Sequence, residues 1–220
     1  MTPVLAALKG CEWLGGNLTI FGPELGDLQD LSSLVYVDGS LMINATHALA
    51  NLDGLSNLTH VSQDLAITNA DALTDLDGLS SLTTVGTTVD IGSNAVLTNL
   101  DGLSGLTQAG NWVVVYYNPA LTNLDGLSNL KSVAGGVAIE YNDLLINVGL
   151  ASLVSVGDGL KIIGNEALSS LDGLSSLKSV GGNAIILDNP ELCTSIVQAL
   201  LEALGGGLVG AVLNEDNKDC

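Results

Sequence analysis

LTNLDGLSGLTQAGNWVVVYYNPA, residues 97–120, is one copy of a phrase of about 24 residues that is repeated along the chain and decides its fold. Seven copies run from Leu25 to Glu191, and one residue is missing between the sixth and the seventh. The first leucines form a column that ends one step beyond the last copy: Leu25, Leu49, Leu73, Leu97, Leu121, Leu145, Leu168 and Leu192. One copy is too short to bury its own apolar side chains, so neighbouring copies must stack into a solenoid. We therefore expect a rod with a functional surface along its side.

The spacing of the apolar residues changes within each copy. It is three around Asp101-Gly102-Leu103, which predicts bends, and two across Val113 and Val115, which predicts a short strand. A glycine column includes the glycine of each Asp-Gly-Leu, and we expect it to occupy a corner where neither a side chain nor a negative φ fits: Gly54, Gly78, Gly102, Gly126, Gly149 and Gly173. The sequence therefore predicts an all-β fold in which coils stack about 4.8 Å apart.

The C-terminal end of the rod carries a pattern for a cover. Thr194 and Ser195 are helix-capping residues, and apolar residues follow them at helical spacing as far as the glycine run at 205–207. This pattern predicts a capping helix over the last coil. Residues 208–213 then predict a further strand.

The cysteines are divided between the two ends of the rod. Cys193 and Cys220 flank the C-terminal cap, and we expect a disulfide between them. Cys11 lies about seven coils away, too far to reach either of them, and has no partner in the sequence. We expect one solenoid domain over residues 11–220, with repeats at 25–191, a C-terminal cap at 192–220 and an N-terminal cap segment at 1–10.

The composition limits the classes of partner. Acidic residues number 24 and basic residues five, which gives a formal net charge of −19. Such a chain is repelled by nucleic acids and by anionic membranes, whereas a cationic ligand suits it. No stretch of 18 residues is apolar throughout, so we expect no membrane insertion.

The side chains that catalysis or metal binding would need are not arranged for either. His47 and His60 lie at different places in their copies and have no metal-ligand spacing. The serine after each Asp-Gly-Leu is repeated, which is typical of a turn residue and not of a nucleophile. We expect no enzymatic activity, no metal site and no cofactor.

Two polar columns, one of aspartates and one of asparagines, are candidates for structural or metal-binding roles. The aspartates that precede the glycines would accept local backbone N–H groups in their turns, or would bind calcium between coils: Asp53, Asp77, Asp101, Asp125 and Asp172. A second column is expected to form a structural ladder of side-chain amides at a corner: Asn94, Asn118, Asn142, Asn165 and Asn189.

One copy departs from the others in its strand. Because Val113 and Val115 point inward, alternation turns Trp112, Val114 and Tyr116 outward. The residues expected beside them are Tyr117 and Tyr141 in the next column, Asp90 and Glu140 at the rim, and Lys161 one coil further. Exposed rings with a charged rim are typical of a ligand-binding surface. The alternative is that the rings pack on one another and cover a weak place in the sheet.

The N-terminal residues resemble a known family. CEWLGGNLTI at 11–20, followed by DLSSLVYVDGSLMI at 30–43, is similar to the receptor L domain, the leucine-rich β-helix of the ligand-binding lobes of epidermal growth factor and insulin receptors. LTNLDGLSNLKSVAGGVAI at 121–139 resembles the L-domain-like repeats of fungal cell-wall and bacterial surface proteins even more. The resemblance covers residues 11–220. It implies a right-handed parallel β-helix of about seven to eight coils, with a binding or adhesive role and no catalysis.

The resemblance also bears on Cys11. In family members the matching cysteine usually bonds an upstream cysteine in an N-terminal helical cap. Only residues 1–10 precede Cys11 in this chain, so the resemblance implies a truncated cap and a thiol that is free or forms a dimer.

Three functions remain open at this point. The leading hypothesis is a secreted or cell-surface recognition module that binds a protein or carbohydrate through the aromatic residues. The second is a structural or adhesive spacer in a cell envelope. The third is ice binding through threonine columns, which extend over only three coils each: Thr74, Thr98 and Thr122, and Thr59, Thr83 and Thr107.

Overall fold

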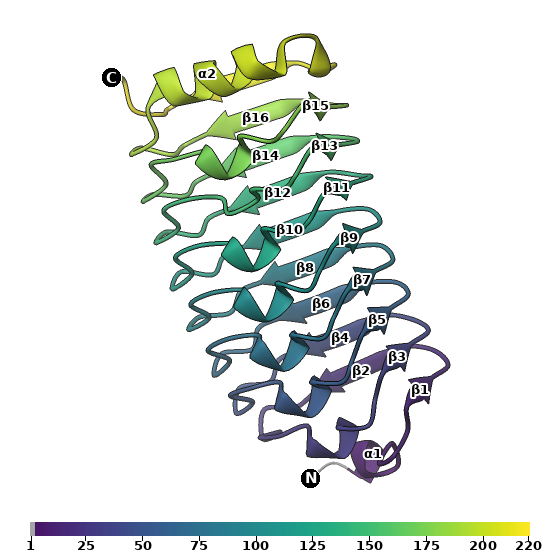
Figure 1. Ribbon diagram of the computed structural model, residues 1–220. Coiled ribbons are helices and arrows are strands. Elements are labelled where there is room, and N and C mark those ends of the chain that lie inside the picture. Colours follow the sequence, from purple (N-terminus) through teal and green to yellow (C-terminus); the bar gives the residue numbers. More distant parts are fainter. Residues whose placement is uncertain (1–2) are drawn as a thin grey trace.

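The structure is a computed structural model that describes residues 3–220 (Figure 1). It confirms that the copies stack as coils of a rod. Most coils contribute a turn of 3-10 helix, a strand of two residues and a strand of four residues, in that order. The strands of each kind align along the rod and form two separate parallel sheets.

Within residues 3–220 the short sheet has eight strands and the long sheet has nine. The short sheet contains β1 (Trp13–Leu14), β3 (Tyr36–Val37), β5 (His60–Val61), β7 (Thr84–Val85), β9 (Gln108–Ala109), β11 (Ser132–Val133), β13 (Ser155–Val156) and β15 (Ser179–Val180). The long sheet contains β2 (Leu18–Phe21), β4 (Leu41–Asn44), β6 (Leu65–Thr68), β8 (Val89–Gly92), β10 (Val113–Tyr116), β12 (Val137–Glu140), β14 (Leu160–Ile163), β16 (Ala184–Leu187) and β17 (Val212–Glu215).

The register of the long sheet follows the columns of the sequence. Val113 of β10 pairs with Val89 of β8 on one side and with Val137 of β12 on the other. These three residues occupy the same place in consecutive copies. Equal positions in successive copies are therefore neighbours in space, as the repeat predicts.

The third side of the rod is built from 3-10 helix and not from a sheet. Its turns are η1 (Gln29–Leu31), η2 (Asp53–Leu55), η3 (Asp77–Leu79), η4 (Asp101–Leu103), η5 (Asp125–Leu127) and η6 (Asp172–Leu174). The parallel, strand-rich part of the fold prediction is confirmed. The all-β description is too strict, because the two sheets are open and the chain also contains 3-10 turns and helices.

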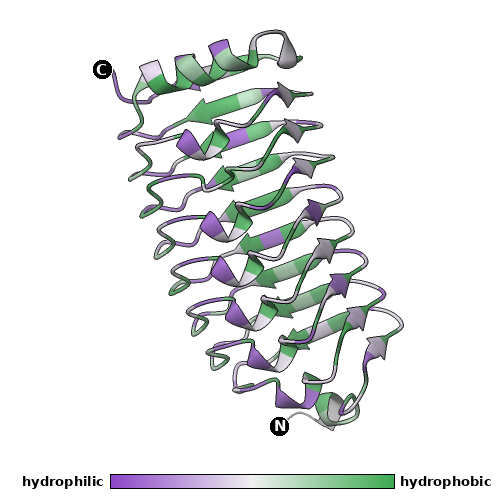
Figure 2. Ribbon diagram, in the orientation of Figure 1, coloured by the Kyte–Doolittle hydropathy of each residue, from purple (hydrophilic) through white to green (hydrophobic). Residues whose placement is uncertain are grey.

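The core is a set of aliphatic columns enclosed by the three sides. Leu73, Leu97 and Leu121 are each 0% exposed, and the inward valines and isoleucines of the long sheet lie beside this column. Figure 2 shows the hydrophobic residues concentrated in the strands of the long sheet, whereas hydrophilic residues mark the outer turns. Each coil shares its buried surface with its neighbours, so the stack is stabilised as a whole.

The glycine column is confirmed as a place where a side chain does not fit, but the expected positive φ is absent from all its members except Gly149. Gly102 lies in a 3-10 turn without a positive φ, and a Cβ on it would overlap the carbonyl oxygen of Leu76 in the preceding coil. The close approach of two backbones therefore excludes a side chain. Gly149 alone in this column has a left-handed conformation, with φ of 55°.

Helices cover both ends of the described chain. At the N-terminal end, α1 (Pro3–Ala6) places Leu5 against the core, while residues 1–2 of the expected cap segment lie outside the description. At the other end, α2 (Thr194–Leu204) covers the last coil and η7 (Gly205–Gly207) follows it. The capping helix is thus confirmed, but its N-cap is Cys193, and no side chain caps it.

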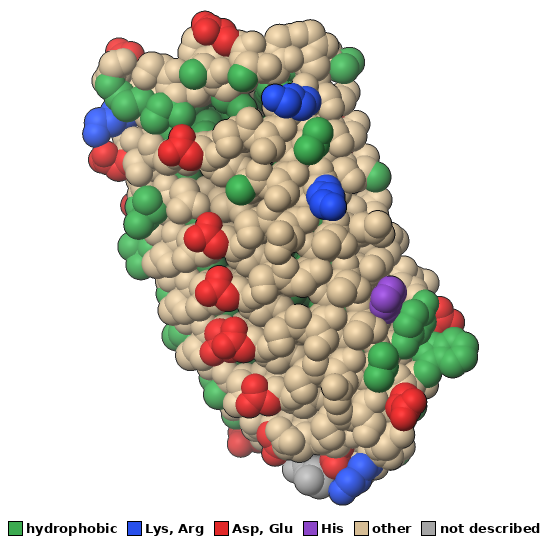
Figure 3. Space-filling view, viewed as in Figure 1, with side chains coloured by type: hydrophobic (Ala, Val, Ile, Leu, Met, Phe, Trp, Pro, Cys, Tyr) green, Lys and Arg blue, Asp and Glu red, His purple; other side chains and the backbone are tan. Residues whose placement is uncertain are grey.

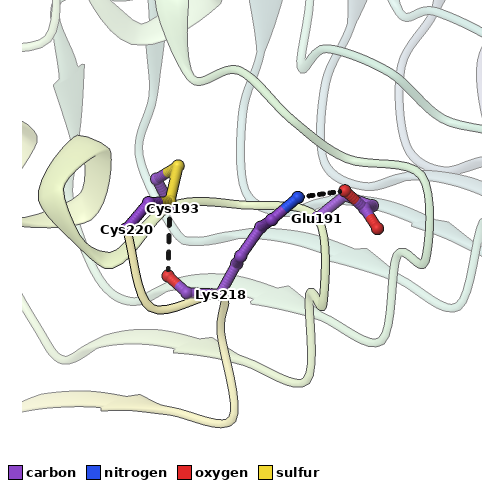
Figure 4. Close-up of a disulfide and its surroundings, with 4 residues drawn as sticks. All are labelled: Glu191, Cys193, Lys218 and Cys220. Atoms are coloured by element: carbon purple, nitrogen blue, oxygen red, sulfur yellow. Dashed lines mark hydrogen bonds and ion pairs between the residues drawn. A yellow bond between two sulfur atoms is a disulfide. The ribbon is translucent and has the colours of Figure 1, made fainter.

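The C-terminal strand and the disulfide complete this cover. The strand after the helix is β17, at Val212–Glu215, later than the predicted 208–213, because pairing with β16 sets its register. The predicted disulfide between Cys193 and Cys220 is present, with a Cα–Cα distance of 5.6 Å (Figure 4). Beside it, the Lys218 amine lies 2.7 Å from a carboxylate oxygen of Glu191.

Candidate functional site

Strand β10 presents the predicted aromatic residues on the outer side of the long sheet. Val113 and Val115 are buried in the core, at 1% and 0% exposure. Trp112, Val114 and Tyr116 are half-buried and alternate with them, so they face away from the core. We call the outer surface formed by these three residues with Tyr117 and Tyr141 the aromatic face.

The two outermost rings of this strand cover glycines in neighbouring coils. A Cβ on Gly136 would overlap the indole of Trp112, and a Cβ on Gly92 would overlap the ring of Tyr116. Gly136 lies in the coil after β10 and Gly92 in the coil before it. The rings therefore extend in opposite directions along the rod and spread the aromatic face over at least three coils.

Three tyrosines form a continuous ladder at one edge of the aromatic face. The ring centroids of Tyr116 and Tyr117 lie 5.9 Å apart at an interplanar angle of 74°. Those of Tyr117 and Tyr141 lie 4.9 Å apart at 9°, which is a stacked arrangement. Tyr117 is 54% exposed and Tyr141 40%, so this tyrosine ladder offers aromatic surface to a ligand.

The backbone holds two of these tyrosines in the left-handed region. The φ angles are 51° at Tyr117 and 55° at Tyr141. The same corner in other coils is also left-handed and carries smaller residues: Ala45, Asn69, Ser93, Gly164, Asp188 and Asp216. A bulky side chain at such a φ is an uncommon choice that costs about 1 kcal/mol or more. The exposed rings are therefore not what this corner requires for folding.

Asp90 places a carboxylate beneath Tyr116. One of its oxygens, Oδ1, is buried and has no hydrogen-bond partner within residues 3–220. Burial raises the pKa of the Asp90 carboxyl, the adjacent Tyr116 hydroxyl lowers this pKa, and the charge of Asp64 raises it. Burial raises the pKa of Tyr116 as well, and the charge of Asp90 adds to the effect.

Asp64 lies next to Asp90 on the same face, but hydrogen bonds lower the pKa of its carboxyl. It accepts hydrogen bonds from the Thr87 hydroxyl and, at 3.1 Å, from the Thr88 N–H. The bond from Thr87 contributes most to lowering the pKa of Asp64, and burial works against it. The two neighbouring carboxyls thus have pKa values shifted in opposite directions.

The remaining predicted residues also lie on the aromatic face. The Lys161 amine is 5.9 Å from the centroid of the Trp112 ring, within the range of a cation–π contact. Glu140 pairs in register with Tyr116 and is followed by Tyr141. The structure therefore brings all the residues expected at the site onto one side of the rod.

Sequence reasoning missed a hollow next to the tyrosine ladder. It has a volume of about 440 Å³, and we call it the acidic hollow. Its lining consists of Tyr141, Gly164, Pro190 and four acidic residues, Asp143, Glu166, Asp188 and Asp216. These acids occupy two columns on either side of the asparagine column, and this spacing was visible in the sequence.

A second group of rings was also missed, on the short sheet near the N-terminal end. The Trp13 and Tyr36 rings meet edge to face with centroids 6.0 Å apart, and the His60 ring stacks on Tyr36 at 5.7 Å. Figure 3 shows hydrophobic side chains gathered beside a histidine at this end. The three residues occupy paired positions of β1, β3 and β5, so the repeat alignment contains this signal.

The aspartate column is exposed, and its carboxylates do not accept the backbone N–H groups of the turns as predicted. The N–H of Asp101 donates to Oδ1 of Asn99 at 3.0 Å, and the other turns repeat this pattern with Asn51, Asp75 and Asn123 as acceptors. The residue two places earlier therefore closes the turn, and the aspartate side chains point to solvent. They form a column of negative charge along the 3-10 side (Figure 3).

The asparagine ladder is confirmed. Asn118 is 0% exposed, and its Oδ1 accepts the backbone N–H of Asn94 at 3.1 Å. Its Nδ2 donates to the Ile91 carbonyl at 3.0 Å and to Oδ1 of Asn142 at 3.2 Å. Asn217, which follows strand β17, extends the ladder beyond Asn189. The ladder links consecutive coils at a corner where water is excluded.

Two further findings concern the described chain as a whole. Within residues 3–220, no three His, Cys, Asp or Glu side chains are grouped so that they could hold a metal ion. No helix in the same range is both long and apolar enough to span a bilayer.

The fold and the site together define a strand-rich solenoid of stacked leucine-rich coils that presents aromatic rings on its side. The sequence matches no protein-family model, and it matches none of the curated proteins.

Proposed function

We propose that this protein is a non-enzymatic recognition module of the cell surface or the extracellular space, which binds a protein or a glycan through the aromatic face. The observation that carries the proposal is the tyrosine ladder. Tyr117 and Tyr141 place exposed, stacked rings at left-handed positions where other coils have small or polar residues. Exposed aromatic rings at a corner that other coils fill with small or polar residues are typical of a binding surface.

Electrostatics and the disulfide support this proposal. The rings stand beside Asp90 and Glu140, and a charged rim around aromatic residues is typical of binding surfaces. The disulfide between Cys193 and Cys220 is the kind of cross-link that persists in oxidising compartments.

We also place the chain among receptor L-domain-like proteins, and we infer a right-handed coil because crossovers between parallel strands are right-handed.

A structural spacer is the second candidate, and one observation favours it. The Trp112 and Tyr116 rings cover Gly136 and Gly92, which contribute no side chain to the sheet surface. Rings that only shield a weak part of the sheet would need no ligand. Ice binding has less support, because the hydroxyls of Thr98 and Thr122 already donate to carbonyls of the preceding coil, each at 3.2 Å.

The test begins with glycan and protein arrays probed with the intact protein. Binding of a ligand found there is then measured for Trp112→Ala and Tyr116→Ala. We expect each variant to weaken binding by about tenfold or more, which corresponds to about 1.4 kcal/mol. Trp13→Ala is the matched control, because it removes an exposed ring from the short sheet and should leave this binding unchanged. Full affinity in folded Trp112→Ala and Tyr116→Ala proteins, and in a folded protein with Tyr117→Asn and Tyr141→Asn, would refute the role of the aromatic face and favour the spacer.

A further inference from the structure

We propose that the partner bound by the aromatic face is a basic protein segment, with an arginine side chain seated in the acidic hollow against Tyr141. This inference rests on the proposed function, because it names the ligand class for the same surface. It depends on three features of the structure: the shape of the hollow, its charge, and the rings that form its edge.

The hollow continues the aromatic face without interruption. Tyr141 belongs both to the tyrosine ladder and to the lining of the hollow. Its ring covers Gly164, since a Cβ on this glycine would lie 2.5 Å from ring atom Cδ1. A ligand that stacks on Tyr117 and Tyr141 can therefore extend directly into the hollow.

The charge of the hollow is of one sign. No basic residue is among its described lining, and its four acidic residues are exposed: Asp143, Glu166, Asp188 and Asp216. Lys218 is only two residues after Asp216, but its amine is paired with Glu191 at 2.7 Å. With a net charge of −19 on the whole chain, an anionic ligand would be repelled and a cationic one attracted.

The arrangement suits an organic cation and not a metal ion. The four acidic residues border a space of about 440 Å³, yet within residues 3–220 no three acidic side chains are grouped so that they could hold a metal ion. A guanidinium group is planar, donates several hydrogen bonds to separated carboxylate oxygens and stacks on tyrosine rings. A neutral sugar could stack on the same rings, but it would gain nothing from the charge.

The experiment measures the binding of fluorescent octa-arginine and octa-lysine peptides by anisotropy at physiological salt, about 150 mM. The hollow variant combines Asp143→Asn, Glu166→Gln, Asp188→Asn and Asp216→Asn. Its matched control removes the same number of charges from the 3-10 side, where the carboxylates are also exposed, by Asp53→Asn, Asp77→Asn, Asp101→Asn and Asp125→Asn. Circular dichroism and thermal melting verify that both proteins are folded.

A ring variant completes the design. Tyr117→Asn and Tyr141→Asn replace both rings by the residue that the same left-handed corner carries at Asn69, so this protein should fold normally. We expect the hollow and ring variants each to bind octa-arginine about tenfold more weakly, and the matched control to lose less than about twofold. Octa-lysine should bind the native protein more weakly than octa-arginine does, because an ammonium group does not stack on tyrosine as a guanidinium does.

Equal losses in the hollow variant and in its matched control would overturn the inference, because bulk charge would then explain the binding. Octa-arginine binding that is unchanged in the ring variant would overturn it too. A neutral glycan that requires Trp112 and Tyr116 but is insensitive to the hollow variant would refute the basic partner and leave the proposed function standing. The absence of any ligand sensitive to Trp112→Ala, to Tyr116→Ala or to the ring variant would refute both.

Discussion

The asparagine ladder allows one prediction to be worked out from individual contacts. Asn118→Ala removes the Oδ1 that accepts the Asn94 backbone N–H at 3.1 Å and its side-chain amide at 3.1 Å. It also removes the Nδ2 that donates to Ile91, to Tyr116 and to the next asparagine of the ladder. The site is 0% exposed, so water cannot replace these bonds without opening the corner.

The expected cost follows from these losses. A buried N–H of Asn94 without a partner costs about 1 to 3 kcal/mol, and each further lost hydrogen bond adds about 1 kcal/mol. Because some groups retain other partners, we expect Asn118→Ala to lower the free energy of unfolding by about 3 to 5 kcal/mol. The control is Asn99→Ala, which removes one partly exposed acceptor of the Asp101 N–H and should cost about 1 kcal/mol or less.

Urea unfolding followed by circular dichroism measures both variants, and hydrogen exchange of the Asn94 amide reports the local effect. Exchange at Asn94 should accelerate strongly in Asn118→Ala and remain native in Asn99→Ala. Because a solenoid is stabilised by contacts between neighbouring coils, a separate unfolding step for one end of the rod would agree with this reasoning. Equal unfolding midpoints for the two variants would show that the ladder does not hold the coils together.

Three further predictions concern the cap, a coil contact and a titration. Replacing Cys193 and Cys220 together by serine opens a loop with a sequence separation of 27, and the chain-entropy estimate for such a loop is about 3.5 kcal/mol. A lower melting temperature that reduction of the native disulfide reproduces would agree, and an unchanged one would contradict this. Gly102→Ala should destabilise the protein by about 1 to 3 kcal/mol because its Cβ meets the preceding coil, whereas Gly26→Ala, with open space around it, should not. The folded pKa of Asp90 is raised above 3.8, so its ionised form destabilises the fold as pH rises above this value. Asp90→Asn should therefore increase stability at pH 7, and the gain should disappear below pH 3.8; urea titrations at several pH values test this.

The repeat predicted most of the fold because its columns are also its contacts. The leucine column, the inward valines, the C-terminal helix and the disulfide were all expected from spacing and position, and the structure contains them. The glycine column was correctly assigned to a place where a side chain does not fit, but the positive φ expected there occurs only at Gly149. At Gly102 a side chain is excluded by the Leu76 carbonyl of the preceding coil. Such a contact between two backbones leaves no separate signal in one sequence.

The candidate site was predicted in part. Alternation along one strand correctly turned Trp112 and Tyr116 outward, since this depends only on the period of a strand. The acidic hollow was missed because it is formed by corners of several coils, whose separate residues look unremarkable in each copy. The same limit applies to the aspartate turns, where the choice between the aspartate and the residue two places earlier as acceptor depends on local backbone geometry.

The amino-acid sequence by itself determined the stacking, the buried columns and the residues that share one side of the rod. A strict period makes every coil equivalent to the next, so positions in one column must become neighbours. Only the tertiary structure decided where the rings extend and where space remains between them. Trp112 and Tyr116 extend over glycines of different coils, and Tyr141 closes one edge of the acidic hollow. These directions depend on the backbone conformation at each corner and on the side chains of the adjacent coil, which no single copy contains.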